Sequence, residues 1–483
     1  MIFLNRFSLL CALFFIFLIS SVFSQQLDST SSGILTGTIV NTSTQSPIPG
    51  ASIFITGTKL GSISNALGKF TVRNIPAGIY NIRASAVGYE ATIQSNIMIS
   101  AGKPTTISFQ LNERTIELQA TEVEANYFQK NAETITSTQL LNSEDIRRAP
   151  GVQEDVIRAV ALLPGVGVTQ AGRNDLVVRG GAPFENLFVV DNIEVPNINH
   201  FGSQGSTGGP LSLINIDFVR DVSFSAGGFG ARFGDRVSSL TNINLRNGNE
   251  ERFGGQLNLS ATGFGVSAEG PIGNVGSYLV SVRRSYLDFI FKAAGFSFIP
   301  EYWDTQIKVN VNLDQKNSLS FLTIGALDGI SFNNDDADKR FNNSRINGSN
   351  QNQYFSGLTW KNLFSTGFFT VTLGRNFSTF DTRQRDSNLV EIFKNVSTEG
   401  ETMLRSDFFF QINPTTELSF GNNIKFASLL DYQLVIPGYT RLDPNGIPQP
   451  LTLDSNFTAL RNGTYASIAS SLTDNLRYTA GVR

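Results

Sequence analysis

Histidine and cysteine are almost absent from this chain, and the motif residues that could act in binding lie between positions 179 and 236. The 483 residues include one histidine, His200, and one cysteine, Cys11. A protein metal centre needs several histidine, cysteine or carboxylate ligands at defined spacings, so we expect no metal, no cofactor and no catalytic residue. His200 and Phe201 precede a glycine- and serine-rich stretch, 202–209. A lone histidine is more often structural, but this pair could contact an external ligand from such a loop.

Arginine and glycine recur together in two short motifs around these residues. The pair Gly180-Gly181 is no phosphate-binding loop, because neither a helix signal nor a lysine follows it. Its glycines instead permit tight turns and close backbone approach, while the arginines can pair with acidic or backbone groups of a surrounding wall. Asp191 follows a buried apolar strand and is expected in a turn rather than as a catalytic acid. The motif residues are Arg179, Gly180, Gly181, Asp191, Gly230, Arg232, Gly234, Asp235 and Arg236.

Composition and the first residues indicate where these motifs operate. The net charge of −3 gives no argument for nucleic acid as a partner. One early positive charge, an apolar run over 9–19 and small residues up to position 24 predict a secretory signal peptide over 1–24. A membrane anchor is the less favoured alternative, because the apolar run is short for a membrane span. Cys11 would leave with the signal, so the exported chain would depend on extended β-structure for its stability.

The stretch 33–112 predicts a small β-sandwich. Five strand-like runs, over 34–40, 51–55, 69–72, 80–86 and 105–111, are separated by breaks that contain glycine or proline. The run PIPGASIFITGTKLGSISNALGKFTVRNIPAGIYNIRASAVGYE resembles carboxypeptidase regulatory-like, transthyretin-like domains. That resemblance implies a structural or docking module. A secreted peptidase is excluded, because the segment lacks the histidine and glutamate ligands of a catalytic zinc.

The stretch 131–248 carries the motifs and one helical segment that would position them. Apolar residues at helical spacing within 143–163, with Asp155 near the start, predict a helix. The sequences LPGV, VRGG, ENLFVVDNIEVP and GARFGD follow in that order. This ordered set resembles the plug domain of TonB-dependent receptors. The resemblance implies a plug inside a barrel, with its arginines fixing it to the barrel wall.

A polar segment, 113–130, connects the predicted β-sandwich to the stretch 131–248. In receptors of the resembled family, a TonB box lies just before the plug and adds itself as a strand to the periplasmic TonB protein. The candidate here is degenerate, because two glutamates interrupt its apolar residues, and a solvated acidic linker is an equal alternative. Its residues are Leu118, Gln119, Ala120, Thr121, Glu122, Val123, Glu124 and Ala125.

From position 252 to 483 the sequence reads as strand-length alternating segments. Leu257 and Leu259 would face outward, with Gln256 and Asn258 inward, and Lys308 also inward. Short connections alternate with long ones over 285–304, 328–351, 381–400 and 430–462, as an outer-membrane barrel requires. Aromatics at 302–303, 354–355, 360 and 408–410 are expected in girdles at the membrane interfaces. We count about eleven strands, against 22 in plugged transporters, and therefore expect the barrel to be incomplete in this sequence.

The predicted fold class is thus mainly β: a small transthyretin-like β-sandwich, an α+β plug and an incomplete antiparallel transmembrane β-barrel. The resemblance implies import of an extracellular siderophore, oligosaccharide or peptide across the outer membrane of a Gram-negative bacterium. The expected partners are the periplasmic TonB complex and outer-membrane lipid. An outer-membrane adhesin or signal-sensing receptor without transport is the alternative.

Overall fold

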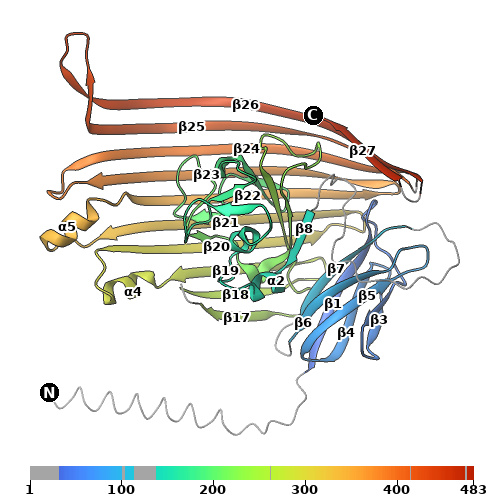
Figure 1. Ribbon diagram of the computed structural model, residues 1–483. Coiled ribbons are helices and arrows are strands. Elements are labelled where there is room, and N and C mark those ends of the chain that lie inside the picture. Colours follow the sequence, from blue (N-terminus) through green and yellow to red (C-terminus); the bar gives the residue numbers. More distant parts are fainter. Residues whose placement is uncertain (1–31, 101–103, 114–137, 261–262, 414, 474–475) are drawn as a thin grey trace, which may run out of the picture.

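The computed structural model describes residues 32–100, 104–113, 138–260, 263–413, 415–473 and 476–483. The predicted signal peptide and the TonB-box candidate lie outside these ranges. β-Structure dominates, as predicted, and Figure 1 shows three parts: an N-terminal sandwich, a central plug segment and a broad antiparallel sheet that we call the wall. Within the described ranges, every helix is too short or too polar to cross a membrane.

The N-terminal sandwich has two sheets, with strand orders β4-β1-β7 and β3-β2-β5-β6. Alternate residues of β1 are buried, so one face of that strand packs between the sheets. The predicted sandwich is confirmed, although β3 and β6 were not among the predicted strands. The bounds are β1 Ser32–Asn41, β2 Ser52–Ile55, β3 Gly61–Ile63, β4 Lys69–Pro76, β5 Gly78–Ser85, β6 Thr92–Ile99 and β7 Thr105–Leu111.

The plug segment is built on a five-stranded sheet of order β12-β11-β16-β15-β8. Strand β11 is buried at every residue and runs parallel to β16, the central strand of the sheet. Two small strand pairs, β9 with β10 and β13 with β14, lie beside this sheet. The bounds are β8 Thr138–Asn142, β9 Val166–Val168, β10 Leu176–Val178, β11 Asn186–Val190, β12 Ile193–Val195, β13 Asn199–His200, β14 Leu211–Ser212, β15 Val219–Ser225 and β16 Ser239–Leu245.

The helix predicted to begin near Asp155 is α3 (Val156–Ala161), and a second short helix, α2 (Ser143–Arg148), precedes it. Pro150 and Gly151 stand between them, and both Gln153 and Glu154 have positive φ, so a single helix could not continue. Asp155 caps α3 as its sequence position suggested, accepting hydrogen bonds from the amides of Ile157 and Arg158 at 2.8 and 3.2 Å. Two 3₁₀ turns, η1 (Pro183–Glu185) and η2 (Ile216–Phe218), complete the segment.

The wall is an antiparallel sheet of eleven strands in sequence order, β17 to β27, which confirms the predicted number. Its alternation also follows the prediction: Leu257 and Leu259 are more than 80% exposed on the outer face, whereas Lys308 is buried toward the plug. The bounds are β17 Gly254–Leu259, β18 Gly263–Ile272, β19 Gly276–Ser285, β20 Phe298–Asn312, β21 Asn317–Phe332, β22 Gly348–Phe364, β23 Gly367–Arg385, β24 Glu391–Asn413, β25 Thr416–Leu442, β26 Pro448–Thr473 and β27 Leu476–Val482.

Connections at the two ends of the wall differ less than predicted. Short turns at 273–275, 313–316 and 365–366 occur where expected. Two opposite connections carry short helices, α4 (Leu287–Ala293) and α5 (Ala337–Asn343). The predicted long loops over 381–400 and 430–462 are wrong, because β23 to β26 continue through them and leave tight connections at 386–390 and 443–447. In the extension of β23, 381–385, the residues on both faces are polar, which hid the strand pattern from the sequence.

The aromatic girdle is present only in part. Trp360, Phe369, Phe408 and Phe420 form a continuous row of ring contacts across neighbouring strands near the short-turn end. Tyr302 was expected in a girdle, but it is buried inside the wall, where its ring lies 4.0 Å from that of His200. The period of two places Trp303 outward and its neighbour Tyr302 inward, so the two could not share a girdle.

Candidate functional site: the contact between plug and wall

The plug segment lies against the inner face of the wall (Figure 1). Buried polar side chains join the two. Apolar residues of the plug also pack on wall residues such as Leu322, Phe355 and Met403 within one buried cluster. Two clusters of charged side chains cross this contact, one centred on His200 and the other on Glu194. They determine how firmly the plug is held.

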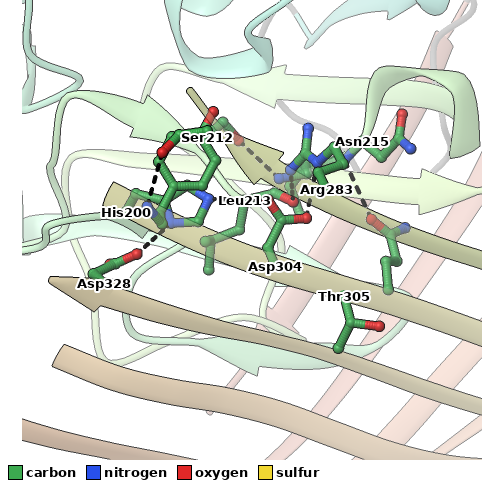
Figure 2. A network of polar contacts seen from close by, with 12 residues as sticks. His200, Ser212, Leu213, Asn215, Arg283, Asp304, Thr305 and Asp328 are labelled. Carbon is green, nitrogen blue, oxygen red and sulfur yellow. Dashed lines mark hydrogen bonds and ion pairs between the residues drawn. The ribbon is translucent and has the colours of Figure 1, made fainter. Parts of the chain in front are cut away.

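His200 is enclosed between two carboxylates of the wall (Figure 2). Its Nδ1 lies 2.6 Å from Asp328 of β21, and its Nε2 lies 3.2 Å from Asp304 of β20. The backbone amide of Phe201, a residue with a φ of 50°, donates to the second oxygen of Asp328 at 2.7 Å. Arg283 of β19 donates to the far oxygen of Asp304 at 2.8 Å and to the carbonyl of a plug residue at 2.7 Å.

The charges in this cluster balance when the imidazole is protonated. Burial alone lowers the pKa of His200, but the opposing carboxylates of Asp328 and Asp304 outweigh it and raise that pKa to about 9. At neutral pH the cluster therefore holds two cations, His200 and Arg283, against two carboxylates. Both ring nitrogens are engaged within the protein, so contact of His200 with a ligand stays a prediction that requires this cluster to open.

Glu194, in strand β12, is the centre of the second cluster. This buried carboxylate receives Arg405 of β24 at 3.3 Å, an amide of Asn423 at 2.8 Å and a short ion pair from Lys425 of β25. Arg405 is 2% exposed and also binds Asp407 at 2.8 Å. A buried ion pair is destabilising when one partner is removed, because the other charge is left uncompensated.

The second arginine-glycine motif joins this cluster from the plug side. Arg232 donates to Asp407 of the wall at 3.0 Å and to Asn192 within the plug at 3.2 Å. Asp235, which has a φ of 65°, binds Lys425 at 3.0 Å. Its pKa is lowered despite partial burial, since Lys425 both hydrogen-bonds to it and attracts it. The structure thus places Arg232 and Asp235 at the wall.

Asp191 and Asn192 form the two-residue turn between β11 and β12, with φ values of 45° and 69°. The Asp191 carboxylate accepts from the amide of Leu245 at 2.9 Å and pairs with Lys308 of the wall at 2.8 Å. The expectation of a turn is confirmed. The side chain in addition fastens that turn to the wall, a role that its sequence position did not reveal.

The remaining motif residues shape the backbone of the plug. Gly180 has a φ of 82°, and a Cβ at Gly181 would overlap the Ser238 hydroxyl. The carbonyl of Gly230 accepts the amide of Phe233 at 3.0 Å, and a Cβ at Gly234 would meet the side chain of Arg483. The two other arginines lie elsewhere: Arg179 is exposed, and Arg236 donates to the carbonyl of its neighbour Asp235 at 2.8 Å.

A cavity of about 440 Å³ opens between the plug loop 203–207 and the inner face of β22 to β26. Gln204 of that loop donates to Glu399 at 2.5 Å and accepts from Asn395 at 2.9 Å. Across the cavity, Arg461 forms a short ion pair with Glu401. Amides and aromatic rings complete the lining, among them Asn197, Gln351, Gln353, Asn376, Phe380 and Phe457.

The sequence did not identify the wall partners. Glu194, Arg405, Asp407 and Lys425 lie up to 231 positions apart along the chain, and the three wall residues occupy strands read only as alternating segments. A charge at an inward position of such a strand was the available signal. That signal predicted the inward orientation of Lys308, and it would also have predicted that of the three wall residues.

Two family models match the chain: the CarboxypepD_reg-like domain over residues 35–123 and the TonB-dependent receptor plug domain over 130–239. TonB-dependent receptor P39 of Formosa agariphila is 26% identical over 204 residues, which cover 40% of this chain and 18% of that protein. TonB-dependent transporter Oar of Myxococcus xanthus is 24% identical over 237 residues, 46% of this chain and 21% of that protein. The chain therefore matches only about a fifth of each relative's length.

The fold has relatives among solved structures. A point mutant of the ferric enterobactin receptor PfeA of Pseudomonas aeruginosa aligns with a TM-score of 0.52 at 15% sequence identity. The alignment covers 73% of this chain and 58% of that one. The likeness concerns the fold: a plug segment packed against an antiparallel wall. The chain thus contains a carboxypeptidase regulatory-like domain followed by a TonB-dependent receptor plug domain, and its sequence is similar to those of TonB-dependent receptors.

Proposed function

We propose that this protein is an outer-membrane receptor that imports a nutrient ligand with energy supplied by the periplasmic TonB complex. One observation carries the proposal: the plug is joined to the wall by charged and polar side chains that can exchange their partners for water. A contact of that kind can be broken and remade in each transport cycle, provided that an external energy source supplies the work. Export by the predicted signal peptide and residence among the lipids of a Gram-negative outer membrane belong to the same proposal.

The cavity between the loop 203–207 and the wall is the proposed place of ligand contact. Its lining combines carboxylates, amides, two arginines, one lysine and aromatic rings. Such a lining suits a polar ligand of small or moderate size, and siderophores, oligosaccharides and peptides all meet that description. Phe201 and His200 lie deeper, against the wall, and would be reached after the Asp328 contact opens. Release of these contacts by ligand would link binding to movement of the plug.

The proposed coupling element is the segment 118–125, which would pair with TonB as an added strand. Val123→Pro removes a backbone donor and fixes φ, so it should abolish energy-dependent uptake while leaving ligand binding at the cell surface unchanged. The control is Val123→Ile, which keeps the backbone donor and β-preference and should transport normally. Uptake and binding would be measured separately in a deletion strain that carries each variant and is supplied with radiolabelled candidate nutrients.

Undiminished uptake by Val123→Pro would refute the assignment of this segment. Surface binding without uptake, seen with every nutrient and with the unmodified receptor, would refute import. That result would favour the adhesin or signal-sensing alternative, which needs the same plug and cavity but no transport.

A further inference from the structure

Strand β4 of the N-terminal sandwich carries a basic stripe along a sheet edge. It is the outermost strand in the order β4-β1-β7, and Lys69, Thr71 and Arg73 alternate along it, so the three side chains share one face. All three contact two acidic residues in the segment that connects plug to wall. Lys69 forms a short ion pair with Glu250, and Thr71 and Arg73 both reach Glu251 at 3.3 Å.

A second contact places the sandwich at the short-turn end of the wall (Figure 1). The hydroxyl of Ser43 donates to Glu417 at 2.7 Å, at the beginning of β25. The amine of Lys361, near the end of β22, donates to the side chain of Gln45 at 3.2 Å. Both partners in the wall lie beside its short turns, and both sandwich residues belong to the connection after β1.

The contacts of the sandwich with the rest of the protein are more exposed to solvent than the buried contacts between plug and wall. Arg73 is 61% exposed and Glu251 is 50% exposed, so water and salt reach their ion pair freely. The buried apolar cluster of the sandwich consists of its own residues only. Between sandwich and plug lies a cavity of about 1260 Å³, lined by β6 and β7 on one side and by β8, α2 and β15 on the other. The sandwich therefore contacts the segment between plug and wall, and the short-turn end of the wall, through polar side chains.

We infer that Glu250 and Glu251 form an acidic docking surface for the basic face of β4, and that the sandwich docks there reversibly, under control of ionic strength. When docked, it covers the plug face formed by α2 and β8. When released, it exposes that face to the solution around it. Exposed ion pairs are strongly screened by salt, and no shared apolar core opposes release. The inference depends on these contacts and holds whether or not the receptor imports its ligand.

Zero-length carbodiimide coupling tests the docking in the whole receptor, held in detergent micelles. The reagent joins an amine to a carboxylate only when they touch, so Lys69 should become linked to Glu250. Mass spectrometry would quantify that link against the link between Lys339 and Asp336, neighbours on α5 that are 3.2 Å apart. Raising NaCl from about 0.02 M to about 0.5 M should lower the relative yield at least threefold, because the screening length shrinks to a few ångströms.

Charge exchange supplies the matched variants. Lys69→Glu and Arg73→Glu together should undock the sandwich and accelerate tryptic cleavage after Arg147, a partly buried residue of α2 that lines the covered cavity. Adding Glu250→Lys and Glu251→Lys should restore both the protection and a link between positions 69 and 250. Arg83→Glu, on an exposed position of β5, is the control and should change neither readout. A yield indifferent to salt, an absent link, or unaltered cleavage in the double variant would each overturn the inference.

Discussion

At the scale of single residues, the plug is held by side chains whose charges match only in the assembled fold. His200 is the clearest case, because it is fully buried and each of its ring nitrogens faces a carboxylate of the wall. The sequence offered a lone histidine with two possible roles. The structure places this side chain between two wall carboxylates that raise its pKa to about 9, so the ring joins plug to wall as a cation at neutral pH. Its protonation is therefore a property of the contact rather than of the residue alone.

This arrangement predicts that the free energy of unfolding of the plug falls as the pH becomes alkaline. The folded-state pKa of His200, about 9, exceeds the ordinary value of 6.5, so its stabilising contribution is complete below about pH 6.5 and is lost as pH rises toward 9. A shift of this size corresponds to roughly 3 kcal/mol. Urea unfolding of the plug between pH 6 and pH 10 would measure the loss. His200→Gln should be less stable at pH 6 and should lack this dependence; equal slopes in both proteins would contradict the prediction.

At the scale of elements, one carboxylate connects the helix α3 to its surroundings. Asp155 caps α3 with one oxygen, while its other oxygen accepts from Asn174 at 2.9 Å and from the amide of Ser212 at 2.8 Å. The short helix is thereby connected to β14 and to the loop before β10. A helix of six residues has little stability of its own, so its position depends on these connections.

Asp155→Ala should consequently cost more than the loss of an ordinary helix cap. The cap alone is worth about 1 kcal/mol, and the buried donors left unpaired add to it, for a total of about 2–4 kcal/mol. Hydrogen exchange at the amides of Ile157 and Arg158 should accelerate accordingly. Asp155→Asn keeps one acceptor oxygen and should lie between the two. Exchange in the alanine variant that matches the unmodified protein would show that the cap does not fix α3.

At the scale of the whole molecule, the cluster around Glu194 connects the plug to the wall strands β24 and β25. Glu194→Gln would leave Lys425 and Arg405 buried without that countercharge, at a cost of about 3–5 kcal/mol. The plug should then separate from the wall at a lower urea concentration, detected by protease cleavage within β11 and β12 while the wall persists. Glu301→Gln, at an exposed position of β20, is the matched control and should have no effect. Equal urea midpoints in the two variants would refute this role.

The alternation of inward and outward residues in strands, and the glycines at turns, could be read from the sequence. Contacts between distant residues could not. Alternation gave the eleven wall strands and the inward orientation of Lys308. The motif glycines and Asp191 gave the turns, because those conformations depend on local sterics. The pairing of Glu194 with Arg405 and Lys425 depends on strand register over hundreds of residues, which no local pattern encodes. The extension of β23 over 381–385 was also missed, since the residues on both of its faces are polar.

The position of β8 has a mechanical consequence. It is the outermost strand of the plug sheet and pairs with β15 alone, from Thr138 opposite Ser225 to Asn142 opposite Asp221. A force applied to the chain ahead of Thr138 would load these hydrogen bonds one after another, like a zipper. The inner pair β11 and β16 would instead have to slide apart with all its bonds loaded together. Traction from the N-terminal side would thus peel β8 first and leave the His200 and Glu194 anchors in place, so that the plug would yield in part before it yielded as a whole.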